Sequence, residues 1–153
     1  MYWLANGRIS RGWARSASGD TAEGISLIDD GIRDYRATGA IIGLPIQLGM
    51  KAEALHLADR TPEALEAIKE AQALAARSGE HRWSAELHRL RGVFLAALGA
   101  EDAEIENSLC AAISTAKQQK SISLATRAEA TYAEYLRQKA SALGGRGFRL
   151  ALC

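Results

Sequence analysis

The densest group of side chains able to do chemistry is the ten-residue stretch Trp83–Gly92. It holds Glu86, His88, Arg89 and Arg91 close together. A carboxylate, an imidazole and two guanidinium groups are side chains that acid–base and anion-binding sites use. On a helix, Glu86 and Arg89 are three residues apart and share one face, so they can pair across a turn. Two interpretations follow: a surface ion pair, or two contacts for a partner molecule.

The remaining sequence contains no catalytic motif. A phosphate-binding Gly-x4-Gly-Lys-Ser/Thr loop and a strand-linked Gly-x-Gly-x-x-Gly are both absent. The glycines of the run 144–147 follow a helix end, which favours a flexible exit rather than a phosphate cradle. His56, His81 and His88 have no cysteine or second histidine at metal-ligand spacing. The sequence therefore predicts a protein that is not an enzyme, with no catalytic residue, metal or cofactor.

The stretch around Gly92 is one copy of a repeat with a period of 40 residues. Small residues at this spacing in the first helices are expected to let the two helices of a pair approach closely. Another small-residue column is expected to let each second helix meet the following pair. The first small column is Gly12/Ala52/Gly92, the second is Gly31/Ala71/Ala112, and a column of large apolar residues is Ile28/Ile68/Leu109. The turns within pairs fall at Gly19/Asp59/Gly99, and the stops between pairs fall at Gly39/Gly79. The second helix of the third copy matches after one extra residue in the preceding turn. A single helix pair cannot bury its apolar face, so the pairs must stack.

Composition and apolar spacing predict that the fold is all-α. Hydrophobic residues make up 48% of the chain and prolines number only two, a mixture that favours helix. Expected N-caps are Asp20, with Glu23 at capping-box spacing, and Thr61 before Pro62. We expect one helical-repeat domain over residues 1–143 and a flexible tail over 144–153. The predicted helices span about 2–17, 20–38, 42–58, 61–78, 82–98, 102–118 and 121–142.

The charges are distributed unevenly although the net charge is only +1. The first three charged residues and the last four are all basic, and the segment between them has a net charge of −6. Solvated faces explain these basic ends best, and nucleic acid is not an expected partner. A nucleic-acid site would need convergence of five arginines on one face: Arg8, Arg11, Arg15, Arg137 and Arg149. No signal peptide or membrane-spanning stretch is apparent, so we expect no membrane association and a cytoplasmic location.

Within the repeat, small residues at positions 8, 20 and 27 and a large apolar residue at 24 resemble the tetratricopeptide repeat (TPR). The segments Arg11–Ala14, Gly24–Ile28, Tyr35–Gly39 and Trp83–Gly92 also resemble the C-terminal helical region of large bacterial ATPase-type regulators fused to adenylate/guanylate cyclase or DNA-binding domains. The resemblance implies a TPR-like right-handed α-solenoid of antiparallel helix pairs, with a seventh helix as a cap. The chain has neither the cyclase nor the ATPase part, so neither activity is expected.

In a TPR-like solenoid the first helices line a concave groove, and exposed polar side chains there contact the partner. The expected groove residues are Trp13, Glu53, His56, Glu86, Arg89, Arg127 and Glu134. Trp3 and Trp83 are expected to be core or inter-repeat wedges. The leading hypothesis is a scaffold for a protein or peptide segment, such as an ATPase or cyclase domain, in bacterial signalling or transcriptional regulation. The alternative is a small-molecule effector sensor with an enclosed pocket. Self-association through the solenoid ends is a further expectation.

Overall fold

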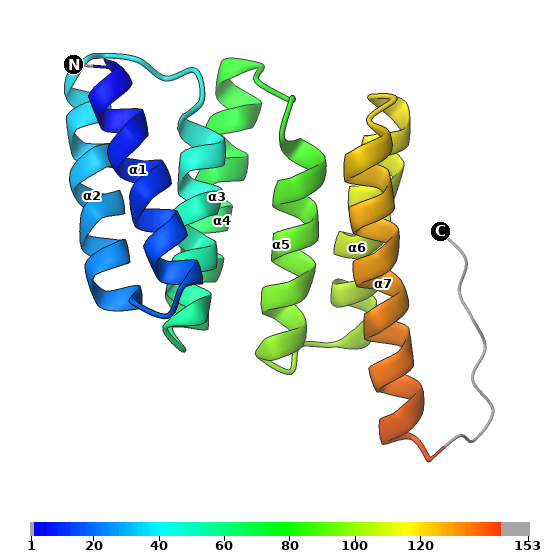
Figure 1. Cartoon of the computed structure of the whole chain (residues 1–153). Coiled ribbons are helices and arrows are strands. Elements are labelled where there is room, and N and C mark those ends of the chain that lie inside the picture. Colours follow the sequence, from blue (N-terminus) through cyan, green and yellow to red (C-terminus); the bar gives the residue numbers. More distant parts are fainter. Residues whose placement is uncertain (1, 145–153) are drawn as a thin grey trace. The chain divides into compact units, whose positions relative to one another are not determined.

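The computed structural model describes residues 2–144, and this part of the chain consists of seven helices and their turns (Figure 1). The helices are α1 (Tyr2–Ala17), α2 (Thr21–Ala37), α3 (Leu44–Leu57), α4 (Thr61–Ser78), α5 (Ser84–Ala97), α6 (Asp102–Gln118) and α7 (Ile122–Ala142). The prediction of an all-α fold is confirmed, and each observed helix end lies within two residues of its predicted place. The predicted flexible tail lies outside the described residues, apart from Gly144.

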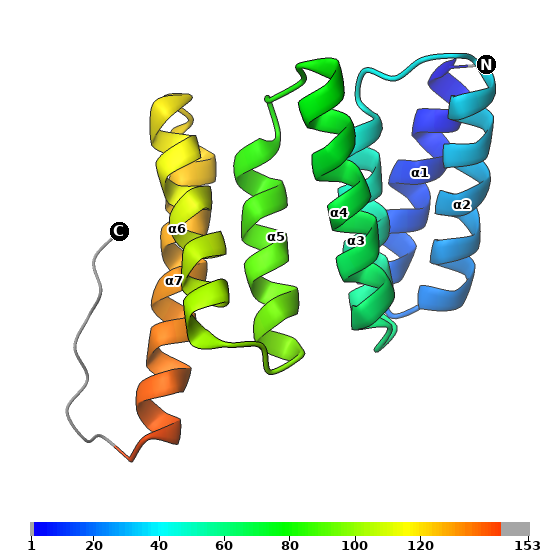
Figure 2. The ribbon, with the colours of Figure 1, turned by 180° about the vertical axis from the view of Figure 1, so that it is seen from behind.

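The chain divides into two compact units, Met1–Trp83 and Ser84–Cys153, and each is described by itself. In the first unit, α1 pairs with α2 and α3 with α4, and α3 also packs on both helices of the first pair (Figures 1 and 2). In the second unit, α5 pairs with α6, and α7 packs against both (Figure 2). The pairs are the antiparallel hairpins that the repeat predicts. That residues 1–143 form one domain stays a prediction.

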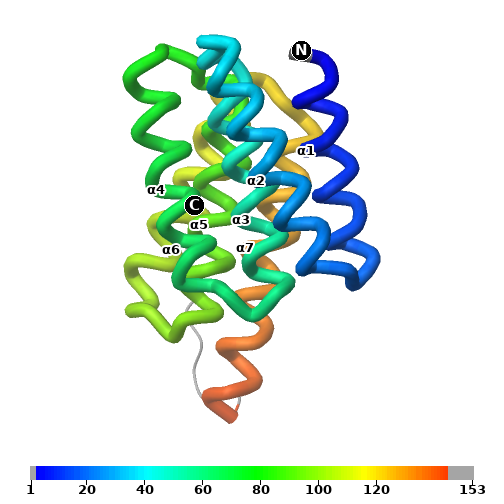
Figure 3. Tube along the Cα trace, turned by 90° about the vertical axis from the view of Figure 1, so that its left-hand side faces the viewer, coloured from blue at the N-terminus to red at the C-terminus, as the bar shows by residue number. Residues whose placement is uncertain are grey.

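Helices α1 and α2 lie side by side (Figure 3), and their backbones come very close at two glycines. A Cβ atom at Gly12 would lie 2.5 Å from the Gly24 carbonyl oxygen, and one at Gly24 would lie 2.6 Å from the Gly12 carbonyl oxygen. In the second unit, a Cβ at Gly92 would lie 2.6 Å from the Leu109 side chain. The Gly12 and Gly92 positions therefore have the role that their column predicts, which is close approach within a pair.

Gly31, one member of the second small-residue column, has a different role from the one predicted; the roles of Ala71 and Ala112 stay a prediction. A Cβ at Gly31 would lie 2.5 Å from the Ile9 side chain and 3.0 Å from the Ala5 carbonyl oxygen, and both residues belong to α1. Gly31 thus serves the contact within its own pair rather than the contact with the following pair. The physical reason is that Gly24 and Gly31, which are two turns apart on α2, both face α1.

Helix ends follow the predicted stops, but the predicted N-cap contacts are wrong. The backbone has positive φ at Gly39 (+75°) and Gly79 (+69°), as helix-terminating glycines require. Asp20 is the N-cap of α2 but makes no capping hydrogen bond, and its carboxylate lies 3.6 Å from Arg15 Nε. The N-cap of α4 is Arg60, because the helix already begins at Thr61.

Replacing Gly12 with alanine tests the close approach of α1 and α2. Gly12→Ala places a methyl group against the α2 backbone, which cannot yield as a flexible side chain does, so we expect a loss of about 1–3 kcal/mol in unfolding free energy. The matched control is Gly7→Ala on the same helix, where a Cβ meets nothing within 4 Å. That substitution is expected to stabilise by about 0.5–1 kcal/mol through helix propensity. Urea unfolding followed by circular dichroism measures both, and equal effects would contradict the packing role.

Candidate functional site

The Glu86–Arg89 pair forms as predicted, but it is buried. Arg89 Nε donates to Glu86 Oε2 at 3.0 Å and Arg89 Nη2 donates to Glu86 Oε1 at 2.8 Å. The side chains are only 7% and 10% exposed, so the prediction that they are exposed groove residues is wrong. Helix α7 covers them: Arg127 Nη1 lies 3.3 Å from Glu86 Oε1, and Thr131 Oγ1 lies 3.4 Å from Arg89 Nη1. The carboxylate of Glu86 is thus shared by two guanidinium groups and joins α5 to α7.

The four polar residues of the Trp83–Gly92 stretch do not converge on one reaction centre. Arg91 reaches α6 instead of α7, where Nη1 donates to Ser108 Oγ at 2.6 Å and Nη2 to Glu104 at 2.7 Å. Burial lowers the pKa of His88, and the nearby Arg91 charge lowers it further. Both effects favour the neutral imidazole. The stretch therefore fastens α5 to both of its neighbours and does not assemble an acid–base site.

In the first unit, two predicted site residues meet directly. Trp13 Nε1 donates to Glu53 Oε2 at 2.8 Å, which joins α1 to α3 across one repeat. Trp13 remains 36% exposed, so Glu53 holds an aromatic side chain that a partner can reach. His56 instead contacts the α3–α4 turn, where its Nδ1 lies 2.9 Å from Thr61 Oγ1. Trp13 and Glu53 are a candidate contact site, and His56 belongs to the turn.

A neighbouring pair of carboxamides was not predicted. Gln47 Nε2 donates to Asn6 Oδ1 at 2.7 Å, again between α3 and α1. Gln47 is only 4% exposed, and its Oε1 atom has no hydrogen-bond partner in the described part of the chain. An unpaired buried acceptor costs about 1–3 kcal/mol, which makes Gln47 unusual among buried residues. One signal in the sequence could have identified Gln47: it is a polar residue at a repeat position where the next repeat has Leu87. We call Asn6, Trp13, Gln47 and Glu53 the α1–α3 cluster.

The remaining predicted site residues lie on α7. Arg127 joins the Glu86–Arg89 pair, as described. Glu134 accepts two hydrogen bonds from Arg137, at 2.8 and 2.6 Å, and one from Gln138, and it is exposed on the helix surface. Of the predicted site residues, Trp13 and Glu53 therefore meet in the first unit, and Glu86, Arg89 and Arg127 meet in the second. His56 and Glu134 each make only local contacts. Their role in binding a partner stays a prediction.

The tryptophan predictions are wrong in one case. Trp3 is 82% exposed, so it is not a core wedge. It lies in the first turn of α1, on a side of the helix that the rest of the first unit does not cover. Trp83 is half-buried, and the Arg82 guanidinium lies 5.5 Å from its ring centroid, a distance at which a cation is attracted to an indole face.

Most of the basic residues at the chain ends are paired with carboxylates. Arg8 Nη1 lies 2.6 Å from Asp34, and Arg137 Nη2 lies 2.6 Å from Glu134. Arg15 is paired with Glu23. Arg149 lies outside the described residues. Three of the five arginines that a nucleic-acid site would need are therefore already neutralised by neighbours.

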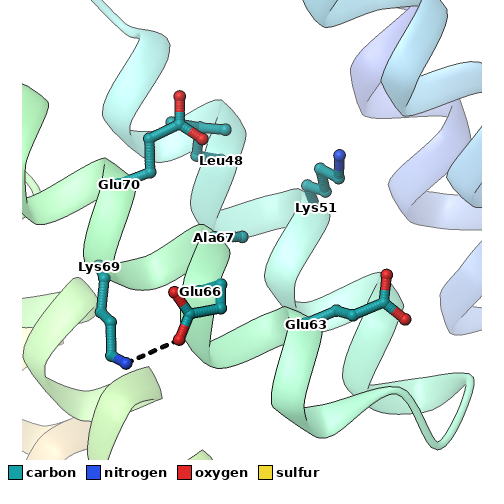
Figure 4. Close-up of a pocket in the computed structure, with 7 residues that line it drawn as sticks. All are labelled: Leu48, Lys51, Glu63, Glu66, Ala67, Lys69 and Glu70. Atoms are coloured by element: carbon teal, nitrogen blue, oxygen red, sulfur yellow. Dashed lines mark hydrogen bonds and ion pairs between the residues drawn. The ribbon is translucent and has the colours of Figure 1, made fainter.

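A hollow of about 510 Å³ lies over α3 and α4 in the first unit (Figure 4). Its lining residues are Leu48, Lys51, Glu63, Glu66, Ala67, Lys69 and Glu70. The charges there are matched: Lys69 Nζ lies 2.7 Å from Glu66, Lys51 Nζ 2.7 Å from Asp29 and Arg36 Nη2 2.6 Å from Glu70. This hollow is therefore a surface whose charged side chains are largely ion-paired. In the part of the chain that the structure describes, no three His, Cys, Asp or Glu side chains gather to hold a metal ion.

Polar contacts also hold α7 to the start of α6. Lys139 Nζ lies 2.7 Å from Asp102 and 2.9 Å from Glu106, and the Tyr135 hydroxyl donates to Asp102 at 2.6 Å. The hydrogen bond from Lys139, and then that from Tyr135, lowers the pKa of Asp102. Burial, followed by the hydrogen bond to Asp102, raises the pKa of Tyr135 to about 12. The hydrogen bonds to Asp102 and Glu106 raise the pKa of Lys139. Each shift favours the protonation state that keeps α7 attached.

These helix pairs define a TPR-like helical fold. Over 81% of the chain, the fold matches that of Bacillus thuringiensis PlcR, with a TM-score of 0.74 and 22% sequence identity. The match covers 44% of the PlcR chain, whose crystal structure is in complex with the peptide PapR7 and DNA. An uncharacterised protein of Rhizobium meliloti (strain 1021) is 33% identical over 117 residues, which make up 76% of this chain. The chain spans only 11% of that relative's length. No protein-family model matches the chain. Among the described helices, none has the length and apolar character needed to cross a bilayer.

The buried Glu86–Arg89 pair and the exposed Glu134–Arg137 pair allow a matched comparison, since both are bidentate and three residues apart. Glu86→Gln leaves two guanidinium groups facing a neutral amide, and we expect the unfolding free energy to fall by about 1.5–3 kcal/mol. Glu134→Gln is expected to leave the unfolding free energy nearly unchanged, because water screens an exposed pair. Urea titrations of both variants measure the difference. Similar losses in both would mean that burial does not strengthen the first pair.

The α6–α7 contacts predict how stability depends on pH. The folded pKa of Asp102 lies below its ordinary value of 3.8, so its contribution is present above about pH 4 and is lost as the pH falls further. Tyr135 titrates near 10.0 when unperturbed and at about 12 in the fold, so its contribution is complete below pH 10 and is lost between these values. Tyr135→Phe is expected to reduce the fall of Tm at alkaline pH. Part of that fall should remain, because the pKa values of Tyr132 and Lys139 are also raised in the fold. Thermal melts across this range measure the slopes, and equal alkaline slopes would contradict the role of Tyr135.

Proposed function

We propose that this chain is a non-enzymatic TPR-like module that binds an extended protein segment at the α1–α3 cluster. The observation that carries the proposal is the partly exposed Trp13 indole, held in place by the carboxylate of Glu53 at 2.8 Å. An oriented aromatic side chain supplies a large contact area at low entropic cost, which is why tryptophan is common among the residues that dominate binding energies.

The carboxamides of the same cluster suit a polypeptide main chain. Each carboxamide offers both a donor and an acceptor, as does each peptide group of an extended segment. In the free chain Gln47 Oε1 is a buried acceptor without a partner among the described residues. A side-chain rotation that turns this oxygen toward a bound segment lets a main-chain N–H satisfy it, so binding removes a cost that the free chain carries.

The fold of PlcR supports the same function by analogy, because that protein was solved with a bound peptide. Fold likeness alone does not define function, so the local contacts of Trp13 and Gln47 carry the argument. The biological setting that we propose is bacterial signalling or transcriptional regulation. A signalling ATPase or cyclase domain is the kind of protein whose segment the module would bind, as the sequence resemblance implies.

A small-molecule sensor is the competing function, and it has less support. The hollow over α3 and α4 is lined by side chains that are already ion-paired. A specific small-molecule site is instead mostly apolar, with a few convergent polar groups.

Binding of linear peptides tests the proposal. Peptides selected from a random displayed library on the intact chain are titrated against variants. Trp13→Ala is expected to weaken binding by about tenfold or more, as loss of an anchoring aromatic residue does. Lys69→Ala on α4 serves as the control and should leave affinity unchanged. Failure to select any peptide, or equal affinities of the Trp13→Ala and Lys69→Ala variants, would exclude this site.

Gln47→Leu gives an independent test in which stability and binding change in opposite directions. The substitution removes the unpaired buried acceptor, and Leu87 shows that leucine fits this position of the repeat. We expect an unfolding free energy raised by about 1 kcal/mol together with weaker binding of the selected peptides. Urea unfolding and peptide titration of the same variant measure the two effects. A variant that is less stable, or that binds the peptides unchanged, would mean that Gln47 has a structural role only.

A further inference from the structure

Two residues on the outer side of α1 match in type the residues at the corresponding positions of α3, the helix that packs on the first pair. Counting back one period of 40 residues from α3, Leu44 corresponds to Leu4 and Lys51 to Arg11. Leu4 and Trp13 lie nine residues apart, which on a helix places them half a turn from each other in direction. The outer side of α1 is therefore separate from the α1–α3 cluster.

The packing of α3 shows what these positions do when they are covered. Leu44 is 3% exposed, Leu48 and Leu55 are each 2% exposed, and α3 contacts both α1 and α2. Lys51 Nζ lies 2.7 Å from the Asp29 carboxylate of α2. Leu44, Leu48 and Leu55 share one face of α3 with Lys51, because they are spaced three and four residues apart. We infer from the Lys51–Asp29 contact that this face lies toward the preceding pair.

The corresponding positions on α1 are uncovered. Leu4 is 74% exposed, against 3% for Leu44. Arg11 is exposed and forms no ion pair within residues 2–144, whereas Lys51 is paired with Asp29. Gly7 stands in the place of Gln47, and a Cβ atom added there would meet nothing within 4 Å. Leu4 and Arg11 thus match Leu44 and Lys51 of the α3 interface, but no helix of the first unit covers them among the described residues.

The α1 face differs from that of α3 in being more basic. Arg8 replaces Leu48, and Arg15 replaces Leu55. Their partners, Asp34 and Glu23, lie on α2 of the same pair, and the Arg8 and Asp34 side chains are still about two-fifths exposed. Arg8 and Arg15 are thus already paired, and Arg11 is the guanidinium group of this face that has no carboxylate partner among the described residues. A surface that fits the face must therefore bring a carboxylate to Arg11.

We propose that the outer face of α1 (Leu4, Gly7, Arg8, Arg11 and Arg15) is a docking face for a further TPR-like helix pair. That pair packs on α1 as the α1–α2 pair packs on α3. Leu4 lies between its two helices, and a carboxylate of its second helix, in the place of Asp29, binds Arg11. Continuity with the α3 interface identifies the occupant, and the charge of the face defines its chemistry.

An extended chain tests this docking face with a defined probe. A second copy of residues 2–43 is placed before Leu4, so that the turn ending at Gly43 is kept and Leu4 takes the place of Leu44. We expect a single thermal transition with a Tm above that of the original chain, because nearest-neighbour contacts add to the stability of a repeat array. Arg11→Glu in the extended chain is expected to lower its Tm by about 2–4 °C.

Two controls distinguish docking from a general effect of charge. Arg11→Glu in the original chain should leave Tm unchanged, because the side chain has no ion-pair partner there among the described residues. In the extended chain, Asp29→Lys in the added copy should restore the Tm lost through Arg11→Glu, since the ion pair is reversed. A separate transition for the added pair, or an equal effect of Arg11→Glu in both chains, would overturn the proposal.

The original chain itself can reveal another occupant. Sedimentation of the unmodified chain and of Leu4→Ser shows whether two copies associate through this face. A dimer that Leu4→Ser abolishes would overturn the assignment to a helix pair, because a second copy would then cover the face. A monomer in both cases, together with the expected melting results, supports it.

Discussion

The close approach of paired helices is the constraint on which the rest of the fold depends. At Gly12 and Gly24 the two backbones lie so near that neither position has room for a side chain. This contact sets the distance between α1 and α2, and that distance sets the width of the surface on which α3 packs. A rigid pair of this kind can hold Asn6 and Trp13 at fixed positions opposite α3. Precise placement of the α1–α3 cluster is therefore a result of glycines that lie outside it.

Periodicity was enough to predict the helices and their pairing, because small and apolar residues recur wherever backbones meet. It was not enough to predict burial at Glu86 and Arg89. Their exposure depends on α7, whose position relative to α5 follows from contacts between residues far apart in sequence, such as that between Arg89 and Thr131. Gln47 was missed for a related reason. A glutamine at an interface position is recognised as an unpaired acceptor only when all of its neighbours are known.

Charge in this chain serves mainly to connect helices. Arg91, Lys51 and Lys139 each join two helices through a carboxylate. Exposed pairs of this kind contribute little individually to stability, but they specify which helix faces meet. Many charged residues in the described part of the chain therefore have a structural role. Trp13 and the Gln47 oxygen differ from this pattern, since one offers apolar surface to solvent and the other is an acceptor for which the described residues supply no donor.

The attachment of α7 has a consequence for motion. This helix has 21 residues, of which Ala128 and Tyr132 are buried. Ion pairs of Arg127, Glu129 and Lys139 connect it to α5 and α6. Salt weakens exposed ionic contacts far more than apolar packing. Helix α7 is thus the part of the second unit with the lowest expected free energy of local opening. Its backbone amides should exchange with deuterium sooner than those of α6, and more so as ionic strength rises.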